Sequence, residues 1–238
     1  MASKGVSSLS ISDAARWYVR VARDGMDVIN SVSSLGETNF LERTNLTFIP
    51  RRARRRSWSM SDDVFPKVMT LLMVVQNGRV LLGEKKRGFG AGFWNGFGGK
   101  VEDGEGVDEA ALRELQEECG IDAVDMSKRG VLQFVYDDQS RPMEVHVYHC
   151  SQFTGDIVET DEMRPRWWAI EKIPLEKMWP DDEHWYPLFL ANKYFTGTVQ
   201  FTNTTTIVEH DIREVLQATL TEISNQKAKA RRERSGAA

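Results

Sequence analysis

The sequence predicts an α+β domain built around a mixed β-sheet. Strand-like apolar runs outnumber helical segments in the 238 residues, and short turns join them in place of the repeated helical crossovers of a parallel α/β fold. The two cysteines, Cys119 and Cys150, are too few for a disulfide framework, and a chain of this length can bury a core without one. The longest apolar run, residues 68–75, is too short to span a bilayer. A membrane-spanning chain, a collagen-like chain and a disulfide scaffold are therefore excluded.

Residues 1–65 form an N-terminal extension that we expect to be flexible or to serve targeting. Residues 11–29 are compatible with a helix whose arginines resemble a mitochondrial transit peptide and whose aspartates argue against one. Five arginines in residues 51–56 precede Ser57 and Ser59, a pattern that suits a basophilic kinase or a nuclear-import receptor, with a charged linker as the favoured alternative. Met60 is a candidate internal start. We expect a cytoplasmic protein with a nuclear pool, and a mitochondrial pool only if the extension directs import.

The folded domain is expected over residues 66–215. Apolar runs over 68–75 and 79–83 flank Asn77 and Gly78, which favour a tight hairpin because both residues tolerate positive φ. A glycine-rich stretch over 88–99 then leads to a helix over 106–119, which Gly120 ends. Beyond it the pattern predicts strands over 130–136, 143–153 and 166–170, a helix over 183–192 and a hairpin over 194–208. A last helix is expected from Asp211 to about residue 230, so that residues 216–238 form its end and a basic tail.

The charges are unevenly distributed along the chain. Residues 61–225 carry 16 basic and 29 acidic side chains, a net charge of −13, whereas both ends are basic. A domain this acidic is a poor general binder of nucleic acid, so we expect no stable nucleic-acid partner and no membrane partner. Any phosphate substrate should arrive with divalent metal ions. Binding of nucleic acid through the basic ends would be weak and sensitive to salt.

Three acids lie on one face of the predicted helix over 106–119. Glu114, Glu117 and Glu118 have the spacing i, i+3 and i+4, which places them together at 3.6 residues per turn. Like charges at this spacing are ordinarily a solvated surface. Here a glycine-rich loop precedes the helix, and clustered hard oxygen donors are what Mg²⁺ or Mn²⁺ prefers. The pattern therefore indicates a site for Mg²⁺, with Mn²⁺ as an alternative.

The full spacing around these acids is specific. From Gly99, the chain reads Gly-x5-Glu105-x7-Arg113-Glu114-Leu115-x-Glu117-Glu118-x-Gly120-Ile121, which resembles the Nudix hydrolase signature at every specified position. The resemblance implies an α/β/α sandwich with the motif as loop-helix-loop, and hydrolysis of a nucleoside diphosphate linked to another moiety. It implies that Glu114, Glu117 and Glu118 hold the metal with the Gly98 carbonyl, and that Gly99, Glu105, Arg113 and Gly120 are structural.

The same resemblance assigns the remaining catalytic roles. Glu118 or a neighbouring glutamate would relay the proton, and Glu162 looks like the extra ligand or base that such enzymes take from outside the motif. Metals there would polarise phosphoryl oxygens and lower the pKa of bound water. Which glutamate is the general base stays open.

A second set of residues narrows the substrate. Asn95 offers a donor and an acceptor to a purine edge, and the adjacent acids Asp181 and Asp182 can share a proton. The segments over 85–100, 161–165 and 178–182 resemble the members of the family that act on oxidised purine nucleoside triphosphates. The resemblance implies such nucleotides as substrates, and we expect a monomer. The expected pocket residues are Thr70, Lys85, Phe89, Asn95, Phe134, Met143, Trp179, Asp181 and Asp182, with Tyr136 as a further wall; core packing is the alternative for Phe134 and Tyr136.

Two other functions remain open at this stage. One is a different Nudix activity, such as cleavage of ADP-ribose, a dinucleoside polyphosphate or an mRNA cap. The other is a non-catalytic module of the same fold, although such proteins typically lack the motif acids. Cys119 is expected in packing, His184 on a helix surface, and His146 and His149 on opposite sides of a strand, where they make a poor metal pair.

Overall fold

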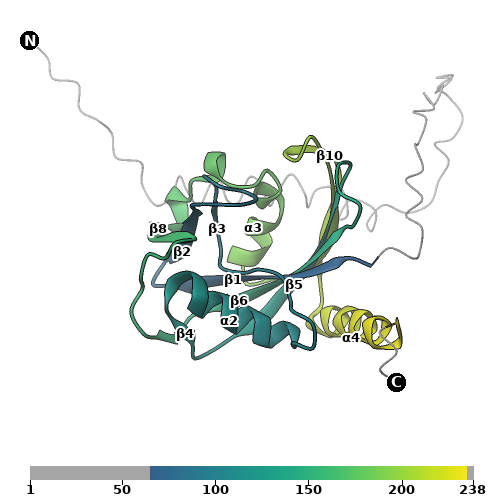
Figure 1. The fold of residues 1–238 in the computed structure, drawn as a ribbon, viewed down its shortest axis with the longest axis horizontal. Helices are drawn as coiled ribbons and strands as arrows, with labels where there is room; N and C mark the ends of the chain where they lie inside the picture. The colour runs from purple at the N-terminus through teal and green to yellow at the C-terminus, as the bar shows by residue number, and fades with distance from the viewer. Residues whose placement is uncertain (1–64, 235–238) are drawn as a thin grey trace, which may run out of the picture. The chain divides into compact units, whose positions relative to one another are not determined.

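The computed structural model describes residues 65–234. In this part of the chain one sheet of eight strands has the order β10-β9-β5-β6-β1-β2-β3, with β8 paired to β2 (Figure 1). The sheet is mixed, because β1 runs parallel to β6 and β5 parallel to β9, whereas the other neighbours are antiparallel. Its strands are β1 (Lys67–Gln76), β2 (Arg79–Lys85), β3 (Trp94–Asn95), β5 (Ser127–Tyr136), β6 (Met143–Cys150), β8 (Met163–Ala169), β9 (Tyr194–Thr202) and β10 (Thr206–Val215).

Helices cover both faces of the sheet, as the expected sandwich requires. α2 (Val107–Cys119) packs on one face and α3 (Asp182–Leu190) on the other. Alternation along β1 explains this: Leu72 and Val74 belong to the core beneath α2, whereas Met73 belongs to the core that contains α3. The smaller elements are β4 (Asp122–Ala123), which pairs with β7 (Phe153–Thr154), and the short 3₁₀ helices η1 (Ile170–Lys172) and η2 (Leu175–Lys177). Ala123 of β4 packs against the core beneath α2, and Leu175 of η2 packs against the core that contains α3. The α+β prediction is confirmed.

The turn and the loop before α2 depend on glycine. Asn77 and Gly78 adopt φ values of 53° and 71°, so the predicted hairpin forms between β1 and β2. Gly98 serves a different purpose, since a Cβ at this position would lie 2.0 Å from the Thr70 carbonyl oxygen. Only glycine lets the loop run this close to β1, and the loop backbone there lies beside Glu114 and Glu118 in the second half of α2.

The C-terminal helix begins later than the sequence pattern predicts. Residues 211–215 belong to β10, which pairs with β9 as far as Val215 opposite Tyr194, and α4 (Gln217–Arg234) follows. The expectation of a helix from Asp211 is therefore wrong. Ile212 packs against the core, so continued pairing with β9 outweighs the local helical pattern. Other element ends differ by a few residues. The strand expected over 143–153 stops at Cys150, and Phe153 belongs to the separate short strand β7.

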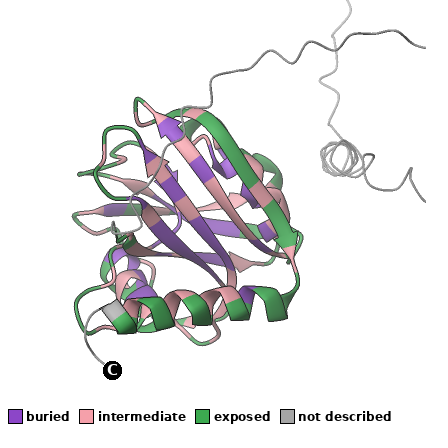
Figure 2. Cartoon of the chain, turned by 90° about the vertical axis from the view of Figure 1, so that its right-hand side faces the viewer, coloured by how far each residue is buried: buried purple, intermediate pink, exposed green. Residues whose placement is uncertain are grey.

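Helix α4 lies along the α2 side of the sheet, against β5 and β9 (Figures 1 and 2). Leu220 of α4 is buried, and the residues of this helix that face away from the sheet are exposed. No helix among residues 65–234 is both long and apolar enough to cross a membrane.

Candidate active site

A pocket opens on the α3 side of the sheet. Strands β1, β5 and β6 form its floor, the loop over 89–96 forms one wall, and the segment from Trp179 to Trp185 forms another. All nine residues expected from the sequence line it, and so does Tyr136. Phe134 and Tyr136 are also members of the buried core, so the pocket and packing interpretations both apply. Stretches that lie far apart in the sequence therefore converge on one cavity.

Aromatic rings line the mouth of the pocket. The Phe89 ring stacks on the Trp179 ring with centroids 5.0 Å apart and planes 25° apart. Phe93 meets the same indole edge-on at 4.9 Å, and Phe89 also contacts Tyr136 edge-on at 6.1 Å. Phe89 is 51% exposed although it is a large apolar side chain. These rings offer flat apolar surfaces suited to a heteroaromatic base.

Two buried acids lie deeper in the pocket. Asp181 and Asp182 are 5% and 2% exposed. Trp185 Nε1–H donates to Asp181 Oδ2 at 3.1 Å, and the Trp179 backbone N–H donates to Asp182 Oδ2 at 3.1 Å. Burial raises the pKa of Asp181 to about 6, and burial together with the charge of Asp181 raises the pKa of Asp182 well above its ordinary value. The pair therefore holds a proton at neutral pH, so one carboxyl donates a hydrogen bond while its neighbour accepts one.

Asn95, on β3, lies in the same cavity. Its Oδ1 accepts the Gly96 N–H at 2.9 Å, which fixes the amide group and leaves its two N–H donors for a ligand. Thr70, from β1, is 4% exposed, and its hydroxyl lies 3.4 Å from both the N–H and the carbonyl oxygen of Gly99. The pocket thus adjoins the loop that precedes α2.

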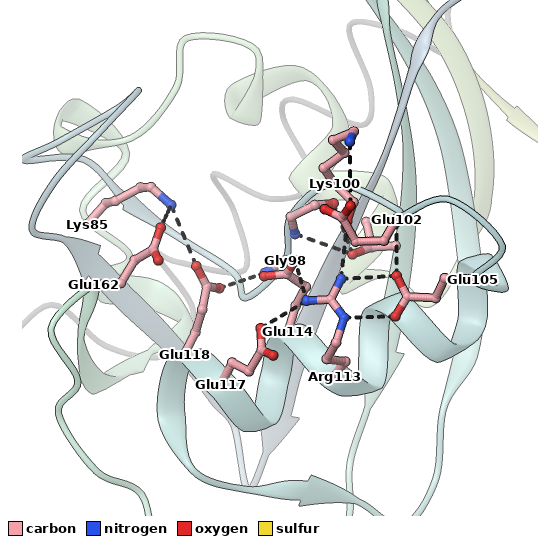
Figure 3. A network of polar contacts seen from close by, with 12 residues as sticks. Lys85, Gly98, Lys100, Glu102, Glu105, Arg113, Glu114, Glu117, Glu118 and Glu162 are labelled. Atoms are coloured by element: carbon pink, nitrogen blue, oxygen red, sulfur yellow. Dashed lines mark hydrogen bonds and ion pairs between the residues drawn. The ribbon is translucent and has the colours of Figure 1, made fainter.

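Glu118 links the pocket to helix α2 (Figure 3). It is 3% exposed, its Oε2 accepts the Gly98 N–H at 2.8 Å, and its Oε1 lies 3.6 Å from Lys85 Nζ. Burial raises the pKa of this carboxyl to about 7, against the opposing effects of the Gly98 hydrogen bond and the Lys85 charge. Near neutral pH such a group can both hold and release a proton, as a general base must.

Lys85 forms a cationic bridge between two acids. Its Nζ donates to Glu162 Oε1 at 2.8 Å, in addition to its ion pair with Glu118. Burial alone would lower the pKa of Lys85, but the hydrogen bond to Glu162 and the charge of Glu118 raise it. The ammonium therefore stays charged where two carboxylates face each other.

Arg113 also bridges acids, those of α2 and of the loop before it. Its Nε and Nη2 donate to the two oxygens of Glu105 at 2.8 and 3.1 Å, so the pair expected from the motif spacing is present. Its Nη1 donates to Glu114 and to Glu117, both at 2.9 Å. A Glu105 oxygen also accepts the Glu102 N–H at 3.0 Å, so the carboxylate that binds Arg113 of α2 also holds the loop backbone. With the Gly98 hydrogen bond to Glu118, the loop before α2 is fixed at both of its ends.

The acids themselves do not form a closed cage. Among residues 65–234, no three carboxylate, histidine or cysteine side chains lie close enough together to enclose an ion. Instead Glu114 and Glu117 share Arg113, while Glu118 and Glu162 share Lys85. The donors are nevertheless hard oxygens, and the Lys85 ammonium occupies the space between two of them. This donor set fits a divalent cation of the Mg²⁺ class.

Sequence reasoning missed several pocket residues. Phe93 and Trp185 line the cavity and contact Trp179 and Asp181, respectively. Trp185 had a usable signal, because it follows Asp181 by four residues at the start of a helix and so shares its face. Phe93 had none, since its neighbours in the glycine-rich stretch have no regular period.

The two cysteines and the four histidines do not line the pocket. His146 is buried beside Glu144, whereas His149 on the opposite side of β6 contacts Phe189. His184, on α3, stacks on His210 with centroids 4.0 Å apart. Cys119 is fully buried in the core beneath α2.

Cys119→Ala is expected to leave turnover within about twofold of wild type and to lower the melting temperature modestly, because the side chain only fills space. Burial raises the pKa of its thiol to about 12, so little thiolate exists at neutral pH. Steady-state kinetics and a thermal melt would check this. Rapid alkylation of Cys119 in the folded protein, with loss of activity, would contradict it.

Comparison with known proteins gives consistent matches. A model of the NUDIX domain matches residues 65–189, which is more than half of the chain. The chain is 50% identical over 149 residues to the oxidized purine nucleoside triphosphate hydrolase of Danio rerio, covering 63% of this chain and 96% of that protein. It is 44% identical to the protein of the same name from Mus musculus, with the same coverage.

A solved structure resembles the fold. The crystal structure of a mutator MutT protein from Bacillus halodurans matches with a TM-score of 0.54 and 22% identity, covering 61% of this chain and 97% of that chain. At this identity the likeness concerns the fold alone.

Proposed function

Because the chain belongs to the NUDIX family, we propose that it is a hydrolase that converts oxidised purine nucleoside triphosphates, such as 8-oxo-dGTP and 2-hydroxy-dATP, to the monophosphate and pyrophosphate. The relatives that it matches over nearly their whole length carry that activity in their names. The observation that carries the proposal is the buried pair Asp181 and Asp182 beneath the Trp179 and Phe89 rings, in one cavity with Lys85. Such an enzyme would remove damaged nucleotides before a polymerase can incorporate them into DNA.

The aspartate pair accounts for recognition of an altered base. Oxidation at C8 of guanine or C2 of adenine changes which ring positions carry a hydrogen-bond donor. A pair that shares one proton can present donor and acceptor in either order. An unmodified purine would leave a buried polar group of the pocket without its partner, which is the strongest basis for discrimination that a binding site has.

We propose that Glu114, Glu117, Glu118 and Glu162, with the Gly98 carbonyl, hold Mg²⁺, with Mn²⁺ as an alternative. When bound, the metal would polarise the phosphoryl oxygens and lower the pKa of its water. Lys85 would exchange its carboxylate partners for a phosphate of the nucleotide. Glu118 or a neighbouring glutamate would accept a proton from the attacking water.

Two proposals concern the whole protein. We propose that it acts as a monomer in the cytoplasm and nucleus, and in mitochondria if residues 1–65 direct import. Residues 1–65 lie almost entirely outside the described part of the chain. Imaging of fluorescent fusions with and without residues 1–59 would test both the extension and the internal start at Met60.

The test of the function is Mg²⁺-dependent hydrolysis of 8-oxo-dGTP and of unmodified dGTP, with products separated by chromatography. We expect 8-oxo-dGMP and pyrophosphate, with kcat/KM at least about 100-fold higher for the oxidised nucleotide. Equal hydrolysis of both nucleotides would reject the aspartate-pair argument, and cleavage of ADP-ribose or a cap analogue in preference to either would favour another NUDIX activity. Binding without hydrolysis would identify a non-catalytic module.

A further inference from the structure

A buried ion cluster joins helix α4 to the back of the pocket. Glu144, on β6, is 3% exposed and accepts three hydrogen bonds: from His146 Nε2 at 2.9 Å, from Lys227 Nζ at 2.7 Å and from Arg231 Nη1 at 2.6 Å. Lys227 and Arg231 come from α4, more than 80 residues further along the chain. We call these four residues the α4 ion cluster.

The charge of Glu144 requires the cations of α4. Burial would raise the pKa of its carboxyl, but the hydrogen bonds from His146 and Lys227 lower the pKa to about 2, so Glu144 stays ionised. Burial lowers the pKa of His146, which is therefore a neutral donor, and its Nδ1 has no partner among the described residues. Lys227 and Arg231 supply the positive charge in direct contact with the carboxylate, and Lys128 of β5 adds to it without contacting it. A buried carboxylate that loses its counter-charge is strongly destabilising.

Helix α4 contacts the sheet through one face only. Lys227 and Arg231 are one turn apart and half-buried, and Leu220 is buried two turns earlier on the same side. Lys229, between the two cations in sequence, points outward, with its side chain 77% exposed. Lys227 and Arg231 thus differ from the neighbouring basic residues because they face the sheet. The run of basic residues in the sequence does not show this difference.

The cluster lies directly behind the pocket. Neighbouring side chains on a strand point to opposite faces, and the residues on either side of Glu144 are Met143 and Val145, which both line the pocket. β6 is held in register by β1 on one side and β5 on the other, and these strands contribute Thr70 and Phe134 to the same cavity. A shift of β6 at Glu144 would therefore move the pocket floor.

We infer that Glu144 is a positioning residue for the nucleotide pocket, held in place by Lys227 and Arg231 of α4. The α4 ion cluster sets the position of Met143 and Val145 and so the fit of the base. Glu118 on α2 is not part of the cluster and keeps its contacts when the cluster is broken. This inference rests on the proposed function only in the choice of substrate.

The test replaces both cations in the full chain, as K227M/R231M, and measures kcat and KM for 8-oxo-dGTP. We expect KM to rise about five- to tenfold while kcat stays within about twofold, because the base loses its fit and the acid helix is unaffected. The exchanged pair K227R/R231K, which keeps both charges, should restore KM. K229M removes the same charge from the outer face of α4 and should leave both constants unchanged.

Other outcomes distinguish the two proposals. The positioning role would be overturned by an unchanged KM in K227M/R231M together with hydrogen exchange that shows a loosened α4. It would also be overturned if K229M raised KM as much as the double variant does. Lack of hydrolysis by the wild-type chain would reject the proposed function instead; quenching of tryptophan fluorescence by 8-oxo-dGMP then measures the affinity of each variant. If the double variant fails to fold, K227M alone keeps Arg231 and should raise KM about twofold.

Discussion

Glu118→Gln is expected to lower kcat by at least about 1,000-fold while the affinity for the nucleotide changes little. Glutamine keeps the size of the side chain and can still accept the Gly98 N–H, so the loop before α2 should hold its position. It cannot accept a proton from water, and it is a weaker ligand for a hard cation. The measurement is steady-state kinetics with Mg²⁺, paired with calorimetric binding of a non-hydrolysable nucleotide analogue.

Glu109 provides the matched control on the same helix. Its carboxylate accepts the Gly106 N–H at 2.8 Å in an exposed position, and Glu109→Gln removes one negative charge without touching the pocket. We expect the control to retain wild-type kcat. Activity of Glu118→Gln within about tenfold of wild type would mean that another glutamate accepts the proton, and Glu114 and Glu162 would be the next candidates.

The sequence was most informative where contacts are local. The spacing of Glu105 and Arg113 is enough to predict their pairing, because they are 8 positions apart and most of the residues between them belong to α2. The hairpin at Asn77 and Gly78 and the end of α2 at Gly120 depend on backbone conformations that few residues adopt. Such features can be predicted from a single chain.

Distant contacts could not be predicted in this way. The sequence predicts the acids of the site but not which cations would pair with them: Lys85 lies between Glu118 and Glu162, and Arg113 lies between Glu114 and Glu117. Residues 216–238 were expected to be the end of a helix and a basic tail, with no contact assigned to its cations, yet Lys227 and Arg231 reach a buried acid on β6. No periodicity in the sequence reveals which of several basic residues will meet a partner more than 80 positions away.

Asp181→Asn is expected to lower kcat/KM for 8-oxo-dGTP by about 100-fold and to leave kcat/KM for dGTP within a few-fold, so that most of the discrimination is lost. The asparagine Oδ1 can still accept from Trp185, but an N–H₂ group then replaces the second carboxylate oxygen. The pair can no longer exchange a proton, and an acceptor in the pocket becomes a donor. Parallel assays on the two nucleotides measure the ratio directly.

Asp122 lies exposed on β4 and serves as the control, since Asp122→Asn removes the same charge far from the pocket and should leave the ratio unchanged. A ratio in Asp181→Asn equal to that of wild type would remove the aspartate pair from base recognition. Asn95 would then be the remaining polar candidate, to be tested as Asn95→Ala.

The same substitution should stabilise the fold at neutral pH. The pKa of Asp181 is about 6 in the folded chain and 3.8 ordinarily, so between these values the folded state binds more protons than the unfolded state. The free energy of unfolding therefore falls as pH rises from about 4 to about 6, and Asp181→Asn should remove this part of the dependence. Thermal melts of both proteins across this range would measure it. A more stable but less selective variant would mean that the buried carboxyl is retained for recognition at a cost in stability. If Asp181 were kept for packing, its replacement would lower the stability and leave the selectivity unchanged.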